Sequence, residues 1–462
     1  MELSGKKTLV LGAGKSGVAG AKFLRERGAT VALHDRKPIA EWNNEAKRLK
    51  EQNIGLLEGN LPSWLLDQIE LVVISPGVPT NTIPARYVDR KDGEVIGEIE
   101  LAYRFLKGRI VGITGSNGKT TTTSLIFEIL KNAGIEAQIG GNIGTPLISL
   151  TETATEQSWT VVELSSFQLE TIRKFRPNVA VALNVTPNHL DRYELFTDYA
   201  AAKHRLFMNQ TAEDVAILNA DDEITASWAA SGLRANVVLF STEKELEEGL
   251  FLRGRDLVCR ANEQEKVLTT RDEMSLRGLH NASNVLAALA AGLACGAAPD
   301  SMRETIKNFK AVEHRLEFVS EIGGVKFYND SKATSVDATQ KALEALADDD
   351  GKIVLILGGL GKNAPYAPLA DLIQKKARKL VLIGEDAPNI ESQLKDFAET
   401  VNAESMQDAV EKGFHSAERG DSVLLAPACA SFDMFGSYEE RGVTFKNCVF
   451  ELGSKFQVQS HK

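Results

Sequence analysis

The sequence predicts an α/β protein of three domains, built on mostly parallel β-sheets. Short β-branched runs alternate with helix-favouring stretches throughout the chain, which is typical of parallel strands connected by helices. These runs form three successive series, and each series opens with or contains a glycine-rich turn. The length of 462 residues also favours three domains, at roughly 150 residues for each.

Each series predicts its own strands. In the first series we expect strands at 8–11, 31–34 and 71–75. The second begins at RIVGIT, with strands expected at 109–114, 159–164, 179–185, 214–219 and 236–240. In the third we expect strands at 353–357, 380–384 and 422–426. The corresponding domains are predicted at 1–97, 98–311 and 312–462.

Composition and charge limit the classes of partner. The chain is 43% hydrophobic and 25% charged, which is ordinary for a globular protein and excludes intrinsic disorder. It carries 53 Lys and Arg against 63 Asp and Glu, a net charge of −10 with a pI near 5.4. Nucleic acids and anionic membranes require clustered positive charge, so neither is an expected partner. An anionic small molecule remains possible, because one pocket can be locally positive.

Cysteine usage and apolar runs predict the compartment. The four cysteines are scattered and form no CxxC pair, as expected for reduced thiols. The apolar stretch at the N-terminus is interrupted early by glycines and predicts a strand rather than a signal peptide. The longest apolar run, 285–298, is too short to span a bilayer. We therefore expect a cytoplasmic protein.

A dinucleotide-style fingerprint opens the chain. TLVLGAGKSG places Gly12, Gly14 and Gly17 after a strand, and the next strand ends in Asp35 about 20 residues on. Glycines let a backbone approach phosphates at the N-terminus of a helix. The pattern predicts a Rossmann-like domain that binds a nucleotide diphosphate, with NAD or FAD as candidates. The alternative is a tight glycine turn that holds no ligand.

A second glycine-rich loop, GITGSNGKTT at 112–121, follows a strand and precedes a helical stretch. The strict pattern GxxxxGK[ST] is not met, because Ile113 occupies the first glycine position. The loop still supplies Lys119 for the β- and γ-phosphates and the Thr120 hydroxyl for Mg²⁺. It predicts a P-loop ATPase domain. A hydride-transfer enzyme has no use for such a loop, which disfavours NAD in the first domain.

Three residues downstream of this loop are candidates for a metal site. Glu163 ends the strand WTVVEL, and His189 follows the next strand at the same predicted edge of the sheet. Lys203 lies in the helix-favouring segment YAAAKHRLF. Taken singly they could be an acid in a salt bridge, a capping histidine and a solvated lysine. Together, after a phosphate loop, they favour an Mg²⁺ site.

With these motifs in place, the sequence resembles the Mur ligase family. The matching segments occur in order along essentially the whole chain: TGSNGKTT, ELSSFQLE, NVTPNHLDRY, AAKHRLF, GLHNASNVLAAL, VEHRLEF and NDSKATSVDAT. GxGxSG in a short first domain, SPG at 75–77 and PACASFDMF at 427–435 resemble the D-glutamate-adding members. A D-N-P-type tetrapeptide, which marks the diamino-acid-adding members, is absent.

The resemblance implies an ATP-dependent ligase with a Rossmann-like third domain that closes on ATP. It would join D-glutamate to UDP-N-acetylmuramoyl-L-alanine through an acyl phosphate, during cytoplasmic peptidoglycan precursor synthesis, as a monomer. The nearest alternative is another ligase of the superfamily, such as a folylpoly-γ-glutamate synthetase, which lacks a GxGxxG domain before the P-loop. Two further alternatives are an NAD-dependent oxidoreductase with a cryptic P-loop and a nucleotide-gated binding protein.

The resemblance also assigns roles to residues of this sequence. Catalytic roles fall on Lys119, His189, Lys203 and Arg315. The ATP contacts would be Gly115, Ser116, Asn117, Gly118, Lys119, Thr120, Thr121, Asn281, Asn284, Arg315 and Asp330. Two Mg²⁺ ions would be held by Thr120, Glu163, His189 and Lys203, the last as a CO₂-derived carbamate. The UDP substrate would meet Gly14, Lys15, Ser16, Asp35, Arg36, Ser75, Pro76, Gly77 and Asn142. D-Glutamate would meet Lys332, Thr334, Lys362, Ser431 and Tyr438, the last standing where a Phe is expected.

Overall fold

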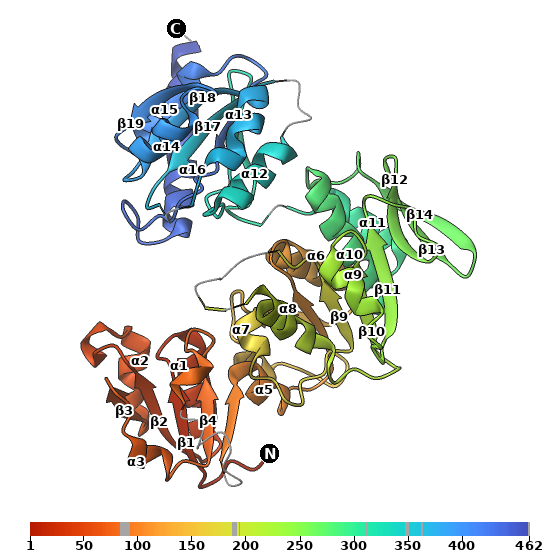
Figure 1. Cartoon of the computed structure of the whole chain (residues 1–462), viewed down its shortest axis with the longest axis vertical. Helices are drawn as coiled ribbons and strands as arrows, with labels where there is room; N and C mark the ends of the chain where they lie inside the picture. Colours follow the sequence, from red (N-terminus) through yellow and green to blue (C-terminus); the bar gives the residue numbers. More distant parts are fainter. Residues whose placement is uncertain are drawn as a thin grey trace. The chain divides into compact units, whose positions relative to one another are not determined.

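The structure is a computed structural model that describes residues 1–83, 93–186, 192–193, 195–310, 312–346, 351–361 and 364–460. The chain divides into two compact units. The first comprises Met1–Met274 and Ser283–Asn308, and the second Ser275–Ala282 and Phe309–Lys462. Two sheets lie in the first unit and one in the second (Figure 1). Strands alternate with helices in all three, so the α/β prediction is confirmed. No helix in the described part of the chain is both long and apolar enough to cross a membrane.

The first sheet is parallel and has five strands in the order β3-β2-β1-β4-β5. Its elements are β1 (Lys7–Leu11), α1 (Lys15–Glu26), β2 (Thr30–Asp35), α2 (Asn44–Arg48), β3 (Gly55–Glu58), α3 (Ser63–Leu66), β4 (Leu71–Ile74) and β5 (Glu94–Gly97). The strand order reverses at β1, which is flanked by β2 and β4. Ligands of such sheets bind beyond the carboxyl ends of the strands at this reversal.

The second sheet has nine strands in the order β14-β13-β12-β11-β10-β9-β6-β8-β7. Its strands are β6 (Arg109–Thr114), β7 (Ala137–Gly141), β8 (Trp159–Glu163), β9 (Val179–Ala182), β10 (Val215–Asn219), β11 (Asn236–Ser241), β12 (Gly249–Arg253), β13 (Asp256–Ala261) and β14 (Gln264–Thr270). The strands from β7 to β12 are parallel, and β12–β14 form an antiparallel extension. The reversal of order again falls at the first strand of the domain, β6.

The second domain has helices between these strands and also before and after them. They are α5 (Glu98–Tyr103), α6 (Lys119–Asn132), α7 (Ser166–Leu169), α8 (Phe196–His204), α9 (Glu223–Ala229), α10 (Leu279–Ala294) and α11 (Pro299–Asn308). Helix α6 starts directly after the predicted phosphate loop, so the orphan amide groups of its first turn face the carboxyl edge of the sheet.

Acidic side chains of α5 hold this helix against two segments of the second domain. Glu100 Oε2 accepts hydrogen bonds from three consecutive backbone amides, those of Arg173, Lys174 and Phe175, at 2.8–2.9 Å. The neighbouring Glu98 Oε1 accepts from the Ile148 amide at 2.7 Å. These charge-assisted bonds hold the segment at Ile148 and the segment at 173–175 against α5.

The third sheet has the order β15-β16-β20-β17-β18-β19, parallel except for β15. Its elements are β15 (Glu317–Ile322), β16 (Val325–Asn329), α12 (Val336–Ala345), β17 (Ile353–Gly358), α13 (Ala370–Lys376), β18 (Ala377–Ile383), α14 (Ala387–Leu394), β19 (Glu399–Ala403), α15 (Met406–Ser416), β20 (Ser422–Leu425) and α16 (Tyr438–Ser460). Alternate residues of β17 enter two separate cores, Leu355 in one and Ile356 in the other. Helices therefore cover both faces, which explains the unbroken apolar run of this strand.

Glu98 makes the stability of the first unit dependent on pH. Burial raises the pKa of its carboxyl from 4.5 to about 7, and its Oε2 has no hydrogen-bond partner among the described residues. The stability that comes from burying the neutral acid is fully present below pH 4.5 and is lost as the pH rises through about 7. The loss approaches ~3 kcal/mol, at about 1.4 kcal/mol per pH unit.

We expect Glu98→Gln to keep the bond to Ile148 and to remove this dependence. Relative to wild type, the thermal midpoint of the variant should rise by about 5 °C between pH 5 and pH 8. Glu45→Gln, at an exposed glutamate paired with Lys22, is the control and should show no such trend. A difference between variant and wild type that stays constant with pH would contradict the role given to Glu98.

Candidate active site

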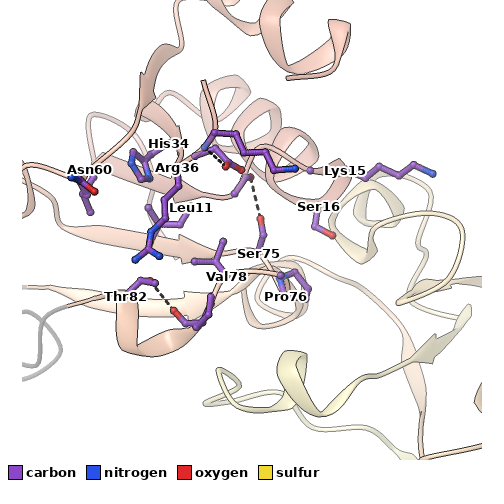
Figure 2. Close-up of a pocket in the computed structure, with 17 residues that line it drawn as sticks. Leu11, Lys15, Ser16, His34, Arg36, Asn60, Ser75, Pro76, Val78 and Thr82 are labelled. Carbon is purple, nitrogen blue, oxygen red and sulfur yellow. Dashed lines mark hydrogen bonds between the residues drawn. The ribbon is translucent and has the colours of Figure 1, made fainter. Parts of the chain in front are cut away.

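A cavity of about 680 Å³ lies at the carboxyl edge of the first sheet (Figure 2). Eight of the nine residues predicted for the UDP substrate line it: Gly14, Lys15, Ser16, Asp35, Arg36, Ser75, Pro76 and Gly77. The ninth, Asn142, lies elsewhere, beside Glu163. The structure thus gathers residues from three separate segments into one pocket at the point where the strand order reverses.

The glycine-rich turn is held in place by its neighbours. Asp35 Oδ2 accepts a hydrogen bond from the Ala13 amide at 2.8 Å, and Ser75 Oγ donates to the Gly12 carbonyl at 3.2 Å. A Cβ atom on Gly17 would lie 1.8 Å from that carbonyl, so only glycine fits there. Asp35 therefore shapes the turn, and its other oxygen accepts from the Lys37 amide.

The wall of this cavity includes residues that the sequence analysis missed. His34, Lys37 and Asn60 also line it, and Figure 2 shows the side chain of Arg36 extending towards Thr82. Lys15, Arg36 and Lys37 give the pocket a local positive charge on an acidic protein. His34 and Asn60 lie at or just beyond the ends of β2 and β3, so the rule that ligands bind at carboxyl ends could have found them.

The predicted phosphate loop joins β6 to α6. Gly118 has a φ of +81°, and a Cβ atom there would lie 2.2 Å from Asn284 Oδ1, which places Asn284 against the loop. The amide of Asn117 donates to Asn184 Oδ1 at 2.8 Å, fixing the loop to the end of β9. Lys119 Nζ donates to the carbonyls of Gly115 and Ser116 at 2.9 and 3.0 Å, folding back over the loop that precedes it.

Lys203 reaches the same loop from α8. Its Nζ donates to the Gly115 carbonyl at 2.8 Å, and the residue is only 1% exposed. Burial, and then the nearby charge of Lys119, hold the pKa of Lys203 well below its usual value, while Glu163 acts in the opposite direction. Two lysines therefore share one acceptor, an arrangement that disfavours two positive charges at once.

Glu163 ends β8 and faces this loop. Asn142 Nδ2 donates to its Oε1 at 2.9 Å, whereas Oε2 is buried and has no hydrogen-bond partner among the described residues. A buried carboxylate oxygen without a partner is costly unless a cation binds it. With the adjacent threonine-rich start of α6, this oxygen fits an Mg²⁺ ion held between protein and phosphates.

The remaining predicted metal ligand is His189. His189 lies outside the described residues, and in the described part of the chain no group of three or more His, Cys, Asp and Glu side chains could hold a metal. Among the described residues, the groups that could bind a metal here are the Glu163 carboxylate, the threonine hydroxyls at the start of α6 and Lys203, so phosphate or a carbamate would complete the coordination.

In the second unit, the predicted D-glutamate residues Lys332, Thr334 and Ser431 lie on loops that follow strands of the third sheet, and Tyr438 begins α16. Lys332 Nζ lies 5.3 Å from the ring centroid of Tyr438, a cation–π contact that Phe would also permit. The Ala428 amide donates to the Ala333 carbonyl at 2.9 Å, tying the loop of Lys332 and Thr334 to the loop of Ser431. Lys362 lies outside the described residues.

A second cavity of about 680 Å³ in this unit brings Asn281 and Arg315 together. Burial raises the pKa of Asp330 to about 6, and Arg315 opposes that rise, so the two predicted nucleotide contacts interact electrostatically. Phe318 and Tyr328 pack edge to face in the same cavity wall, at 5.7 Å between ring centroids. The aromatic rings and the cations of this cavity share its lining with three glutamates, Glu313, Glu317 and Glu321.

Three family descriptions match successive parts of the chain. Residues 6–97 match the description "Mur ligase MurD-like, N-terminal domain". Residues 113–292 match "Mur ligase middle domain", and residues 314–429 match "Mur ligase, glutamate ligase domain". The matches run in the order of the three sheets and leave only short connecting segments uncovered before residue 430.

Relatives from other organisms match nearly the full length. UDP-N-acetylmuramoylalanine--D-glutamate ligase of Koribacter versatilis is 46% identical over 98% of this chain and 99% of the relative. The protein of that name from Acidobacterium capsulatum is 47% identical, over 97% of each chain.

Solved structures share the fold at lower identity. MurF ligase from Thermotoga maritima, in complex with ADP, has a TM-score of 0.63 at 17% identity, covering 91% of this chain and 95% of that one. UDP-N-acetylmuramate-alanine ligase MurC from the same organism has a TM-score of 0.59 at 19% identity, covering 99% and 100%. With three matching domains and relatives of 46–47% identity, the chain belongs to the Mur ligase family.

Proposed function

We propose that the protein is the ATP-dependent ligase that joins D-glutamate to UDP-N-acetylmuramoyl-L-alanine in cytoplasmic peptidoglycan precursor synthesis, acting as a monomer. The near full-length identity of 46–47% to ligases of that name carries the proposal. Its chemistry is supported by a positively charged nucleotide cavity and a phosphate loop within one unit.

The first chemical step is an attack on ATP. A carboxylate is a poor electrophile, so the alanyl carboxylate oxygen attacks the γ-phosphorus and the bond to the ADP oxygen breaks. This gives an acyl phosphate and ADP. The Lys119 ammonium would exchange its bonds to the Gly115 and Ser116 carbonyls for bonds to the oxygens of the transferring phosphoryl group, where negative charge increases. The backbone amides of the loop would hold the other phosphates in position.

Bound Mg²⁺ would neutralise phosphate charge during this transfer. Glu163 offers its unpaired Oε2 to that ion, and Asn142 orients the carboxylate through Oε1. Thr120 adds a hydroxyl, and His189 is assigned a second ion. Lys203 would act as a carbamate, because CO₂ converts its amine into an anionic oxygen ligand.

In the second step, the amine of D-glutamate attacks the acyl-phosphate carbonyl carbon. The tetrahedral intermediate loses a proton from nitrogen and expels inorganic phosphate, leaving the new amide. Lys332, Thr334, Lys362, Ser431 and Tyr438 are proposed to bind the amino acid. Asn281, Asn284, Arg315 and Asp330 are proposed to hold ATP, so both units must contribute to one catalytic cycle.

A coupled phosphate-release assay tests this function. With ATP, Mg²⁺ and UDP-N-acetylmuramoyl-L-alanine present, we expect phosphate release only when D-glutamate is added. L-Glutamate, a diamino acid, L-alanine and D-alanyl-D-alanine are the comparison substrates. Turnover with one of these and none with D-glutamate would show that the chain is a different member of the family.

A further inference from the structure

Arg441 is a buried cation that the proposed chemistry does not use. It lies in the first turn of α16, three residues after Tyr438, and is only 2% exposed. Arginine is rarely buried to this extent without an anionic partner. No carboxylate in the described part of the chain forms an ion pair with it. Burying an unpaired positive charge is costly, so this arginine must contribute something other than an ion pair.

The guanidinium group donates only to neutral oxygens. Nε donates to Ser331 Oγ at 3.0 Å, and Nη2 to the Ser331 and Cys429 carbonyls at 2.8 and 3.2 Å. Nη1 donates to the Ala430 carbonyl at 3.2 Å. Arg441 thus bridges the residue before Lys332 and the two residues before Ser431.

A third loop packs against the same side chain. A Cβ atom on Gly359 would lie 3.1 Å from Arg441 Nη1, so the turn after β17 touches the guanidinium group. Leu360 in that turn forms a β-bridge with Ala430. Ser331 Oγ, in turn, donates to the Tyr438 carbonyl at 2.8 Å. All three loops that carry the predicted amino-acid contacts therefore meet at Arg441.

The positive charge of Arg441 is only partly offset by its surroundings. Burial lowers the pKa of Arg441 to about 10, and only the Cys429 thiol and Asp433 act in the opposite direction. The Cys429 thiol is itself kept protonated by burial. A desolvated guanidinium with no ion pair leaves a positive potential at the loops in front of it, which an incoming anion would relieve.

We propose that Arg441 is a positioning residue for the amino-acid substrate. It holds the three loops in one arrangement, and its charge, which forms no ion pair among the described residues, favours a dicarboxylate over a neutral amino acid. This inference rests on the proposed function, because it assumes that these loops receive D-glutamate. Arg441 acts through Ser331, Cys429 and Ala430 and does not touch the substrate.

Steady-state kinetics of Arg441→Lys and Ser331→Ala test this role. Arg441→Lys keeps the charge and loses the planar four-bond geometry, and it should raise KM for D-glutamate by about 10- to 100-fold. KM for the UDP substrate should stay within about twofold, because its cavity lies in the first unit. KM for ATP should rise less than KM for D-glutamate, because Arg441 binds Ser331 and not the proposed ATP contact Asp330 beside it. Ser331→Ala removes the hydroxyl that accepts from Arg441 Nε and donates to the Tyr438 carbonyl, and it should raise KM for D-glutamate by about 3- to 10-fold. The matched control is Arg378→Lys, at an ion pair with Asp421 at the opposite edge of the same sheet, which should change no KM.

The outcomes separate the inference from the function. Unchanged D-glutamate KM in Arg441→Lys and Ser331→Ala would overturn the positioning role while the proposed function stands. Equal increases in all three KM values, or the same effect in Arg378→Lys, would show a general loss of structure and would also overturn it. If Arg441→Lys fails to fold, Ser331→Ala decides. A wild-type enzyme inactive with D-glutamate would refute the proposed function itself.

Discussion

Replacing Lys119 with alanine should lower kcat by about 10³-fold, the range seen when one preorganised positive or donor group is removed from a transition state. Lys119 begins α6 and sits directly at the phosphate loop, where its ammonium already holds two loop carbonyls. When phosphates enter, that ammonium is the nearest mobile charge for the oxygens that become more negative during transfer. The measurement is phosphate release under saturating substrates.

The control for this prediction lies on the same helix. Lys131, at the other end of α6, has a side chain that is 61% exposed, and Lys131→Ala should retain wild-type kcat. Lys119→Ala should also keep a thermal midpoint close to that of wild type without ATP, because its ammonium donates to the Gly115 and Ser116 carbonyls of its own loop. A variant that keeps kcat within tenfold, or that loses activity only through unfolding, would remove Lys119 from the chemistry.

The sequence predicts the central parallel strands well because both faces of them are buried. Every residue of β8 and β17 is buried, β17 is an unbroken apolar run up to its final glycine, and each expected strand is present within a few residues. The missed strands lack that signal: β14 is mostly exposed over Gln264–Leu268, and β7 contains two glycines at an edge of its sheet. The position of an edge strand depends on pairing with its neighbouring strand, and the hydrophobic pattern of a short sequence segment carries no information about that pairing.

The candidate site was predictable where it follows a strand and a glycine-rich turn. The cavity of the first domain and the loop before α6 both lie where the motifs expect them. Two features depend on packing alone. Asn142 meets Glu163 because β7 and β8 are neighbours, and Arg441 meets Ser331 across 110 residues of chain. Arg441 donates to neutral oxygens, so no charge pattern in the sequence could reveal it.

Lys203→Ala should be the second variant with a very large effect, lowering kcat by about 10³-fold or more. In the proposed mechanism this lysine becomes a carbamate that supplies a second anionic oxygen beside the Glu163 carboxylate. Formation of the carbamate requires a neutral amine, which attacks CO₂ and releases one proton. Burial and Lys119 lower the pKa of Lys203, so the neutral amine is more abundant than in an exposed lysine.

Rescue by a small acid distinguishes this role from a structural one. Formate or acetate can enter the space left by the Lys203→Ala substitution and restore an anionic oxygen, so part of the activity should return in proportion to its concentration. Ammonium or methylamine, which would restore a positive charge, should not rescue. Lys244 provides the control: its ammonium also donates to a backbone carbonyl, that of Ala220 at 2.7 Å, and Lys244→Ala should stay active without added acid.

Two opposite charge states of Lys203 give opposite results in this experiment. If the lysine acts as a cation, the amines rescue and the acids inhibit, because an added anion would compete with phosphate near Lys119. If it acts as a carbamate, the acids rescue and wild-type activity falls when CO₂ and bicarbonate are removed from the buffer. An active Lys203→Ala enzyme would exclude both, and the buried lysine would then serve only to fix the Gly115 carbonyl through its 2.8 Å hydrogen bond.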